Sequence, residues 1–391
     1  MNIASRTIPA IIVSIFVFIL TLHAAELPHI SIESGTGRLV VNGQPFLILG
    51  GELGNSSAGT VAEANSIIPR LAAMHVNTIL MPIAWEQIEP KEGSYDFSIL
   101  DHWIETARRS NMHLVLLWFG SWKNAFSNYA PAWVKSDPKR FPRAESADGR
   151  PLEILSPLSP ETRRFDSRAF AALMHHVREK DSQQQTVLMV QVENEVGYLG
   201  PGRDRSPEAS KLFLGPVPQA LLRALVNKRL ELSPELASHF NQSGGTWTGI
   251  FGDAADEAFM AWNYASYIEA VVQAGKKEYA LPMYVNAQLP APQERAGEYP
   301  VADRTRTIWR SGVQVRRASI STRPTSTGPI SNTGFSGMRF PAIRFLFRKR
   351  ESRVLHTMRS MPTAKRAPLA SVRSRSRALN FPRRTTILNR R

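Results

Sequence analysis

The residues best suited to chemistry in this 391-residue chain follow an apolar segment, Thr186–Val192. Directly after it come Glu193, Asn194 and Glu195, two carboxylates around an amide. Such groups are costly to bury without partners. A lone Glu in this place would most simply be leaving a strand for solvent or pairing with a nearby base. Two carboxylates and an amide together instead indicate a site for acid–base chemistry.

Two other apolar segments end in the same way, with tryptophans beside polar groups. Trp85 and Glu89 end one segment, and Trp118 and Trp122 lie at the end of the other. Aromatic faces stack on sugar rings, and pairs of carboxyl groups cleave glycosidic bonds. The combination favours a carbohydrate site built from Trp85, Glu89, Trp122, Glu193, Asn194 and Glu195.

These segments belong to an alternation of strands and helices. Apolar strands are expected at 46–50, 77–85, 113–119, 186–192 and 281–288, and apolar residues at helical spacing occupy 61–74, 99–107, 165–177 and 258–275. Apolar strands between helices indicate a parallel sheet that is buried on both faces. With long loops after the strands, the pattern predicts a (β/α)8 TIM barrel, incomplete here at about five strands. An open doubly wound sheet is the alternative, although no glycine-rich phosphate loop follows an early strand.

The two ends of the chain differ from this central part. Arg6 and a following apolar run predict a signal peptide over residues 1–25, hence a secreted or periplasmic protein without stable membrane insertion. Residues 26–310 are expected to form the barrel part, beginning with short strands and an Asn42-Gly43 turn. Residues 311–391 are expected to be a disordered basic tail.

The tail accounts for the net charge of +15. From Arg304 onward there are 22 Lys and Arg against one acid, Glu351, whereas the preceding residues carry 26 basic and 32 acidic side chains. Taken by itself the tail would be a nucleic-acid-binding arm, an alternative that conflicts with secretion. The chain has no cysteine, which excludes disulfides and a cysteine nucleophile. Its nine histidines show no metal-ligand spacing, so neither a metal nor another cofactor is expected.

Several motifs together resemble those of one enzyme family. Gln191–Gly197 resembles the fourth-strand signature of glycoside hydrolase family 35, β-galactosidases of a clan of retaining barrel enzymes. Trp85–Phe97, Pro131–Val134 and Tyr284–Ala287 resemble further motifs of a secreted bacterial subgroup, and the likeness extends over Pro28–Trp309. The resemblance implies a retaining hydrolase that acts on terminal β-galactosides or related plant-type oligosaccharides.

Carried over by position, the resemblance implies that Glu195 is the general acid/base and that Asn194 holds the sugar 2-hydroxyl group. It also implies that Glu89 lines the substrate pocket and that Trp85 forms one wall. Glu193 should share a face with Glu195, because side chains two residues apart on a strand point the same way. A structural or sugar-binding role is therefore expected for Glu193.

The second catalytic carboxylate is missing from these motifs. Retaining enzymes use two carboxyl groups roughly 5–5.5 Å apart, and the resemblance implies a glutamate nucleophile that ends the seventh strand. Glu351 is surrounded by basic residues and does not fit. We hypothesise that the reading frame slips near Ser311–Val315. In the alternative frame, Arg316–Gly334 permits the sixth-strand region, and a Glu codon spans Arg348 and Lys349 in a seventh-strand sequence.

Three functions remain open from the sequence. The first is the retaining hydrolase, inactive in this chain for want of its nucleophile and prone to aggregate through open sheet edges. The second is a catalytically dead carbohydrate-binding pseudoenzyme, and the third is nucleic-acid binding by the tail. Departures from the family pattern at Ile88 and Trp118–Trp122 leave the sugar and its linkage undecided.

Overall fold

The computed structural model of the protein describes residues 26–33, 36–199, 202–227, 245–288 and 320–325. The expected signal peptide, the proposed frame slip and nearly all of the expected tail lie outside these residues. Within them, no helix combines the length and the apolar character that crossing a bilayer requires.

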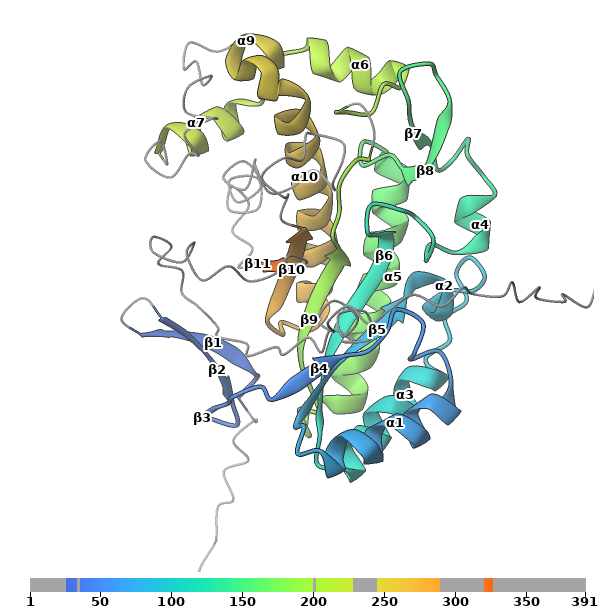
Figure 1. The fold of residues 1–391 in the computed structure, drawn as a ribbon, viewed down its shortest axis with the longest axis vertical. Helices are drawn as coiled ribbons and strands as arrows, with labels where there is room; N and C mark the ends of the chain where they lie inside the picture. The colour runs from blue at the N-terminus through green and yellow to red at the C-terminus, as the bar shows by residue number, and fades with distance from the viewer. Residues whose placement is uncertain (1–25, 34–35, 200–201, 228–244, 289–319, 326–391) are drawn as a thin grey trace, which may run out of the picture. The chain divides into compact units, whose positions relative to one another are not determined.

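The centre of the fold is a sheet of parallel strands that lie in the same order as in the chain (Figure 1). Each strand pairs with the next one along the sheet. The strands are β4 (Gly50–Glu52), β5 (Thr78–Ala84), β6 (His113–Lys123), β9 (Val187–Asn194), β10 (Met283–Gln288) and β11 (Ile320–Thr325). With helices between most of the strands, this is an incomplete (β/α)8 barrel, as the sequence pattern predicts.

One strand departs from that expectation. β11 lies in the segment predicted to be disordered, yet it pairs with β10 from Met283↔Ile320 to Gln288↔Thr325. An unpaired strand edge offers backbone N–H and C=O groups to any extended segment, whatever its side chains, which explains how these six residues can pair there.

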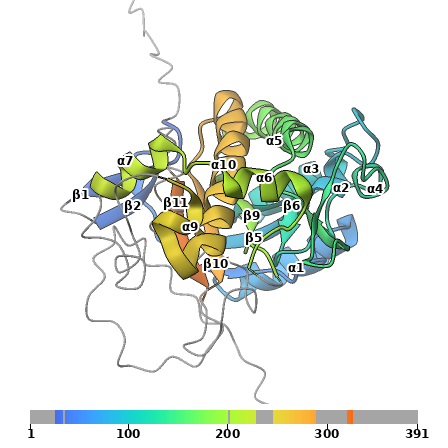
Figure 2. The same cartoon turned by 90° about the horizontal axis from the view of Figure 1, so that it is seen from above.

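Helices cover one face of the sheet, and α5 packs along α10 (Figure 2). The helices are α1 (Val61–Ala73), α2 (Trp85–Ile88), α3 (Ser98–Arg109), α4 (Ala132–Lys135), α5 (Pro160–Asp181), α6 (Pro207–Leu214), α7 (Gln219–Asn227), α9 (Trp247–Phe251) and α10 (Ala255–Glu278), with a 3-10 turn at Gly252–Ala254. Local sequence sets their starts: Ser159 accepts a hydrogen bond from the Thr162 backbone, and Pro160 occupies the first turn of α5. A short antiparallel pair, β7 (Arg143–Glu145) and β8 (Pro151–Leu155), lies between α4 and α5.

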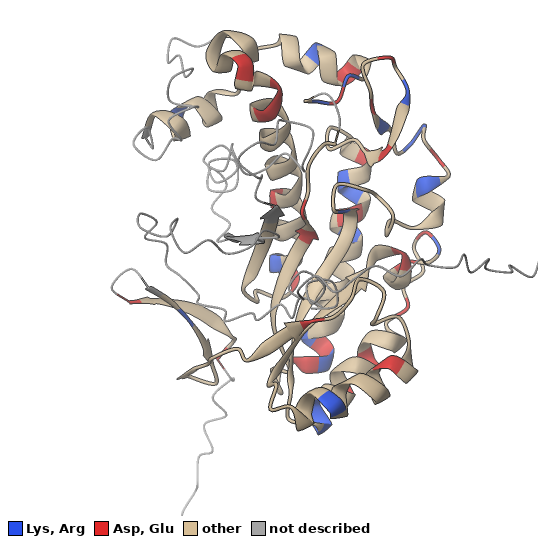
Figure 3. Cartoon of the chain, in the orientation of Figure 1, with Lys and Arg blue, Asp and Glu red and all other residues tan. Residues whose placement is uncertain are grey.

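The parallel strands separate two apolar cores. In β5, Ile79, Met81 and Ile83 pack against the helices, whereas Leu80 belongs to a second cluster on the inner face of the sheet. This alternation is what a strand with two buried faces requires. Charged side chains lie mainly on the helices and connecting loops, and the strands carry few of them (Figure 3).

An antiparallel unit at the start of the described chain contributes to the inner core. It consists of β1 (His29–Glu33), β2 (Thr36–Val41) and β3 (Gln44–Pro45). Asn42 and Gly43 join β2 to β3 with φ values of 51° and 73°, which confirms the turn expected from the Asn-Gly pair. Leu39 and Val41 of β2 pack in the same cluster as Leu80.

Candidate active site

The central strand β9 ends in a sharp change of backbone direction. Glu193 and Glu195 have φ values of 60° and 45°, in the left-handed region that residues other than glycine seldom occupy. Val190 and Val192 pack on the helix side of the sheet, so regular alternation would turn Glu193 toward the inner face. Its side chain instead contacts Asp166 of α5. Glu193 therefore leaves the face that the strand period predicts, because its left-handed backbone breaks that period, and a face shared with Glu195 stays a prediction.

Four amide side chains meet at the carboxyl ends of β6, β9 and β10, and we call them the amide cluster: Asn124, Gln191, Asn194 and Asn286. The Asn194 Oδ1 atom accepts hydrogen bonds from Gln191 Nε2 at 3.0 Å and from Asn286 Nδ2 at 2.9 Å. The Asn194 Nδ2 atom donates to Asn124 Oδ1 at 2.9 Å. Asn194 is thus held on both sides by neighbouring strand ends.

The same neighbours fix the backbone of Glu195. Its N–H donates to Asn286 Oδ1 at 2.8 Å, and its carbonyl oxygen accepts the Ala125 N–H at 3.1 Å. The Glu195 residue remains partly exposed, unlike Asn194. Lys123 brings a positive charge to this end of the sheet, since its Nζ donates to Asn124 Oδ1 at 2.7 Å. A carboxyl group with access to water, beside fixed amides and a cation, can exchange protons with a bound molecule.

Glu193 belongs to a different group on the helix side, which we call the carboxyl cluster: Trp118, Ser121, Asp166, Glu193 and Tyr267. Glu193 accepts the backbone N–H groups of Ser121 at 3.0 Å and of Trp122 at 2.8 Å. Asp166 accepts from Ser121 Oγ at 2.7 Å and from Trp118 Nε1 at 3.0 Å. Burial, and then the neighbouring Asp166 charge, raise the pKa of Glu193 well above its usual value.

Glu89 and Trp85 also lie inside the protein. The Glu89 carboxylate accepts hydrogen bonds from Trp85 Nε1 at 2.9 Å, from the Gly93 N–H at 2.8 Å and from Arg168 Nη2 at 2.5 Å. Neither Glu89 nor Trp85 has exposed surface. Their expected places in a substrate pocket stay predictions, and this geometry supports a structural ion pair between the end of β5 and α5.

Trp122 lies in β6, which extends beyond the strand expected at 113–119. It is the penultimate residue of β6, where its Nε1 donates to the Leu155 carbonyl at 3.0 Å. Its ring meets those of Tyr264 and Tyr267 edge-on, at 4.9 Å and 4.5 Å between centroids. Trp122 is fully buried, so contact with a sugar stays a prediction that would need these rings to move.

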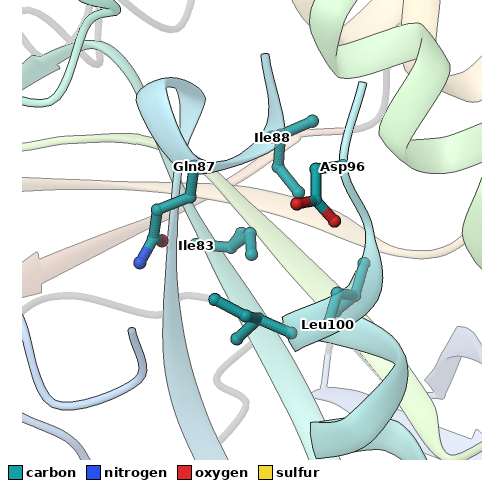
Figure 4. A pocket seen from close by; sticks show the side chains of 6 residues that line it. Ile83, Gln87, Ile88, Asp96 and Leu100 are labelled. Atoms are coloured by element: carbon teal, nitrogen blue, oxygen red, sulfur yellow. The ribbon is translucent and has the colours of Figure 1, made fainter. Parts of the chain in front are cut away.

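A small cavity lies away from both clusters, between β5, α2 and α3 (Figure 4). Its volume of about 20 Å³ suffices for a single water molecule. It is lined by Ile83, Gln87, Ile88, Asp96, Ile99 and Leu100. Nor do the described residues bring three His, Asp or Glu side chains close enough together to bind a metal ion.

The sequence-based prediction missed three members of the amide cluster, Asn124, Gln191 and Asn286, and it also missed Lys123. A signal for them existed. Each interrupts or follows an apolar strand as a polar residue, which is the criterion that singled out Asn194 and Glu195. Applying it to the ends of β6 and β10 would have found Lys123, Asn124 and Asn286, and Gln191 lies in β9 itself, three residues before Asn194.

Residues 59–240, which contain β5, β6 and β9, match the model of glycoside hydrolase family 42, described as beta-galactosidase. The match supports a β-galactosidase-like glycoside hydrolase. It does not single out family 35, to which the strand motifs show a resemblance. No curated protein matches the chain. The matched region includes Asn194 and Glu195, so it covers the central residues of the candidate site.

Proposed function

We propose that this chain carries the acid/base half of a retaining β-galactosidase, with Glu195 as general acid/base. One observation carries the proposal: Asn194 and Glu195 end the fourth parallel strand, within an amide cluster supplied by the strands on either side. Barrel enzymes place their active sites at this end of the strands. The family 42 match supports the reaction class.

In the proposed mechanism, Glu195 protonates the leaving-group oxygen and later takes a proton from the attacking water. Asn194 fits a role in sugar binding. One N–H of its side chain donates to Asn124, and the other has no hydrogen-bond acceptor among the described residues. Because Asn194 is buried, the proposal requires that substrate binding exposes this second N–H to a sugar hydroxyl group, the 2-hydroxyl by the family 35 resemblance.

The nucleophile has to come from elsewhere, because neither β10 nor β11 contains an Asp or Glu. We propose that the alternative frame encodes it, in the Glu codon that spans Arg348 and Lys349. One base inserted within the codons for Ser311–Val315 would restore that frame. The substrate proposed is a terminal β-galactoside or related plant-type oligosaccharide, met outside the cytoplasm after export through residues 1–25.

The experiment compares the 391-residue chain with the restored chain on an aryl β-galactoside. The restored chain should hydrolyse it with retention of configuration, and the 391-residue chain should not. Hydrolysis by the 391-residue chain would overturn the assignment of the nucleophile. Galactose binding without hydrolysis by the restored chain would overturn the proposed activity in favour of a carbohydrate-binding protein.

A variant of the restored chain tests the role of Glu195. Glu195→Ala should slow hydrolysis of an alkyl galactoside by about 10²- to 10⁴-fold, because the leaving group then departs unprotonated. A dinitrophenyl galactoside needs no such proton, so its first step should be spared. Azide, which attacks without a base, should then release the sugar as a glycosyl azide. Equal losses on both substrates without azide rescue would contradict the assignment.

A further inference from the structure

We propose that Glu193 and Asp166 are positioning residues: they share one proton, and together they hold the strand end that carries Asn194 and Glu195. The two carboxyl groups converge at Gly120 and on one backbone donor: the Ser121 N–H lies 3.1 Å from Asp166 Oδ2 and 3.0 Å from Glu193 Oε1. A Cβ atom at Gly120 would lie 2.5 Å from Glu193 Oε1 and 2.7 Å from Asp166 Oδ1. Only a glycine leaves room for both groups.

Among the described residues, none brings a positive charge into hydrogen-bond contact with the pair to balance two carboxylates. Their hydrogen-bond donors in the described chain are the Ser121 and Trp122 amides, the Ser121 and Tyr267 hydroxyls and the Trp118 indole. All of these are neutral, and Glu193 and Asp166 are almost fully buried. Two buried like charges repel strongly, so the pair retains one proton.

The other titratable groups that face the pair come from α10. The Tyr267 hydroxyl donates to Asp166 Oδ2 at 3.1 Å, and Tyr264 lies close enough to feel the Glu193 charge. Burial raises the pKa of both tyrosines well above their usual value, so they stay neutral while Glu193 titrates. The expected pH dependence therefore belongs to Glu193.

The pair is connected to the proposed active site through the backbone. Glu193 binds the N–H groups of Ser121 and Trp122, which directly precede Lys123 and Asn124 on β6. On β9 it directly precedes Asn194 and Glu195. Its left-handed backbone needs support of this kind to persist. Glu193 therefore fixes the ends of β6 and β9 relative to each other, and with them the amide cluster.

The sign of the pH dependence follows from the direction of the pKa change. The pKa of Glu193 is higher in the folded chain than in the unfolded chain. The stabilisation is then fully present below the unfolded value and is lost as the pH rises through the folded value. Glu193→Gln keeps a neutral partner for Asp166 at every pH, because its amide group does not ionise. Its nitrogen cannot accept the Ser121 or Trp122 N–H as a carboxyl oxygen does, so the variant should be less stable at every pH, and the slope of Tm against pH is the quantity that reports on the proton.

The first test uses the 391-residue chain and does not depend on catalysis. Infrared spectra at neutral pH should show the C=O band of a protonated carboxyl group, and Glu193→Gln should abolish it. The fall in Tm as the pH rises above about 4.5 should become shallower in the same variant. Glu208→Gln, at an exposed position in the first turn of α6, should change neither result. Absence of the band, or an unchanged slope, would overturn the proposal.

The second test measures the catalytic consequence, which rests on the proposed function. In the restored chain, the ratio of activity at high pH to activity near neutral pH should be larger for Glu193→Gln than for the unsubstituted protein, whereas Glu195→Gln should lose activity throughout. If the activity of Glu193→Gln falls at high pH just as that of the unsubstituted restored chain does, the positioning role is overturned. If the restored chain is inactive, the proposed function fails, while the infrared and Tm results still decide whether the proton is shared. The same measurements on the restored chain serve if the 391-residue chain aggregates.

Discussion

Glu193 and Glu195 are two residues apart on one strand end and lie in opposite surroundings. Glu193 is buried on the helix side of the sheet, against a second carboxyl group and, among the described residues, without a cation in hydrogen-bond contact. Glu195 is partly exposed, next to the amide cluster, and its backbone is bonded to Asn286 and Ala125. The comparison teaches that an identical side chain can serve folding in one place and chemistry in the other, depending on what surrounds it.

The largest expected effect is a difference in protein stability between substitutions at Glu193 and at Glu195. Glu193→Leu leaves the buried N–H groups of Ser121 and Trp122 without acceptors, which should cost about 3 kcal/mol or more. Glu195→Leu replaces a partly exposed side chain and should cost less than about 1 kcal/mol. Urea unfolding of both variants measures the difference. Equal losses of unfolding free energy would show that Glu193 contributes no more to stability than Glu195 does.

A second change acts on the contact between the two carboxyl groups. Gly120→Ala places a methyl group against Glu193, Asp166 and the Trp118 indole, so it should destabilise the protein by about 2–3 kcal/mol. Gly51→Ala is the matched control, because nothing lies within 4 Å of its added Cβ. It should shift the free energy of unfolding by no more than about 0.5 kcal/mol. Similar thermal melts for the two variants would mean that the pair can separate freely.

The smallest effect compares two tyrosine hydroxyls at α10. Tyr267→Phe removes a donor to Asp166 and a contact of 2.7 Å with Ser121 Oγ, and should cost about 1 kcal/mol. Tyr279, just after the helix, has a buried hydroxyl without a hydrogen-bond partner in the described structure. Tyr279→Phe should therefore be neutral or slightly stabilising. The midpoints of denaturant unfolding, compared at equal denaturant dependence of the unfolding free energy, would measure both changes in stability. A larger loss of stability in Tyr279→Phe than in Tyr267→Phe would contradict the assignment.

Regular patterns made the barrel strands and the main helices predictable. Alternating residues of β5 such as Ile79 and Leu80 serve two apolar cores, so the strand had to be apolar throughout. The Asn42-Gly43 turn was equally readable, because both residues tolerate positive φ. In these places local preference and burial point to the same structure.

The site was only partly predictable, because its decisive features depend on tertiary contacts. Nothing in the sequence marks Glu193 as left-handed, since that backbone is held by Ser121 and Trp122 from another strand. In the sequence, Asp166 looks like any acidic residue of a helix. Its role becomes visible only when α5 packs against β6 and β9. Glu89 drew attention as an acid near a tryptophan, yet Arg168, far along the chain, gives it a structural partner.

The order of the parallel strands has a consequence for synthesis of the chain. From β4 to β10, and on to β11, each strand that leaves the ribosome meets an edge formed by the strand made just before it. Growth then proceeds at one edge, with no need to insert a strand between two already paired. The segment with Asn194 and Glu195 joins the sheet only after β6 has presented Ser121 and Trp122 to receive Glu193. The strands that carry the site can therefore pair in the order in which they are synthesised.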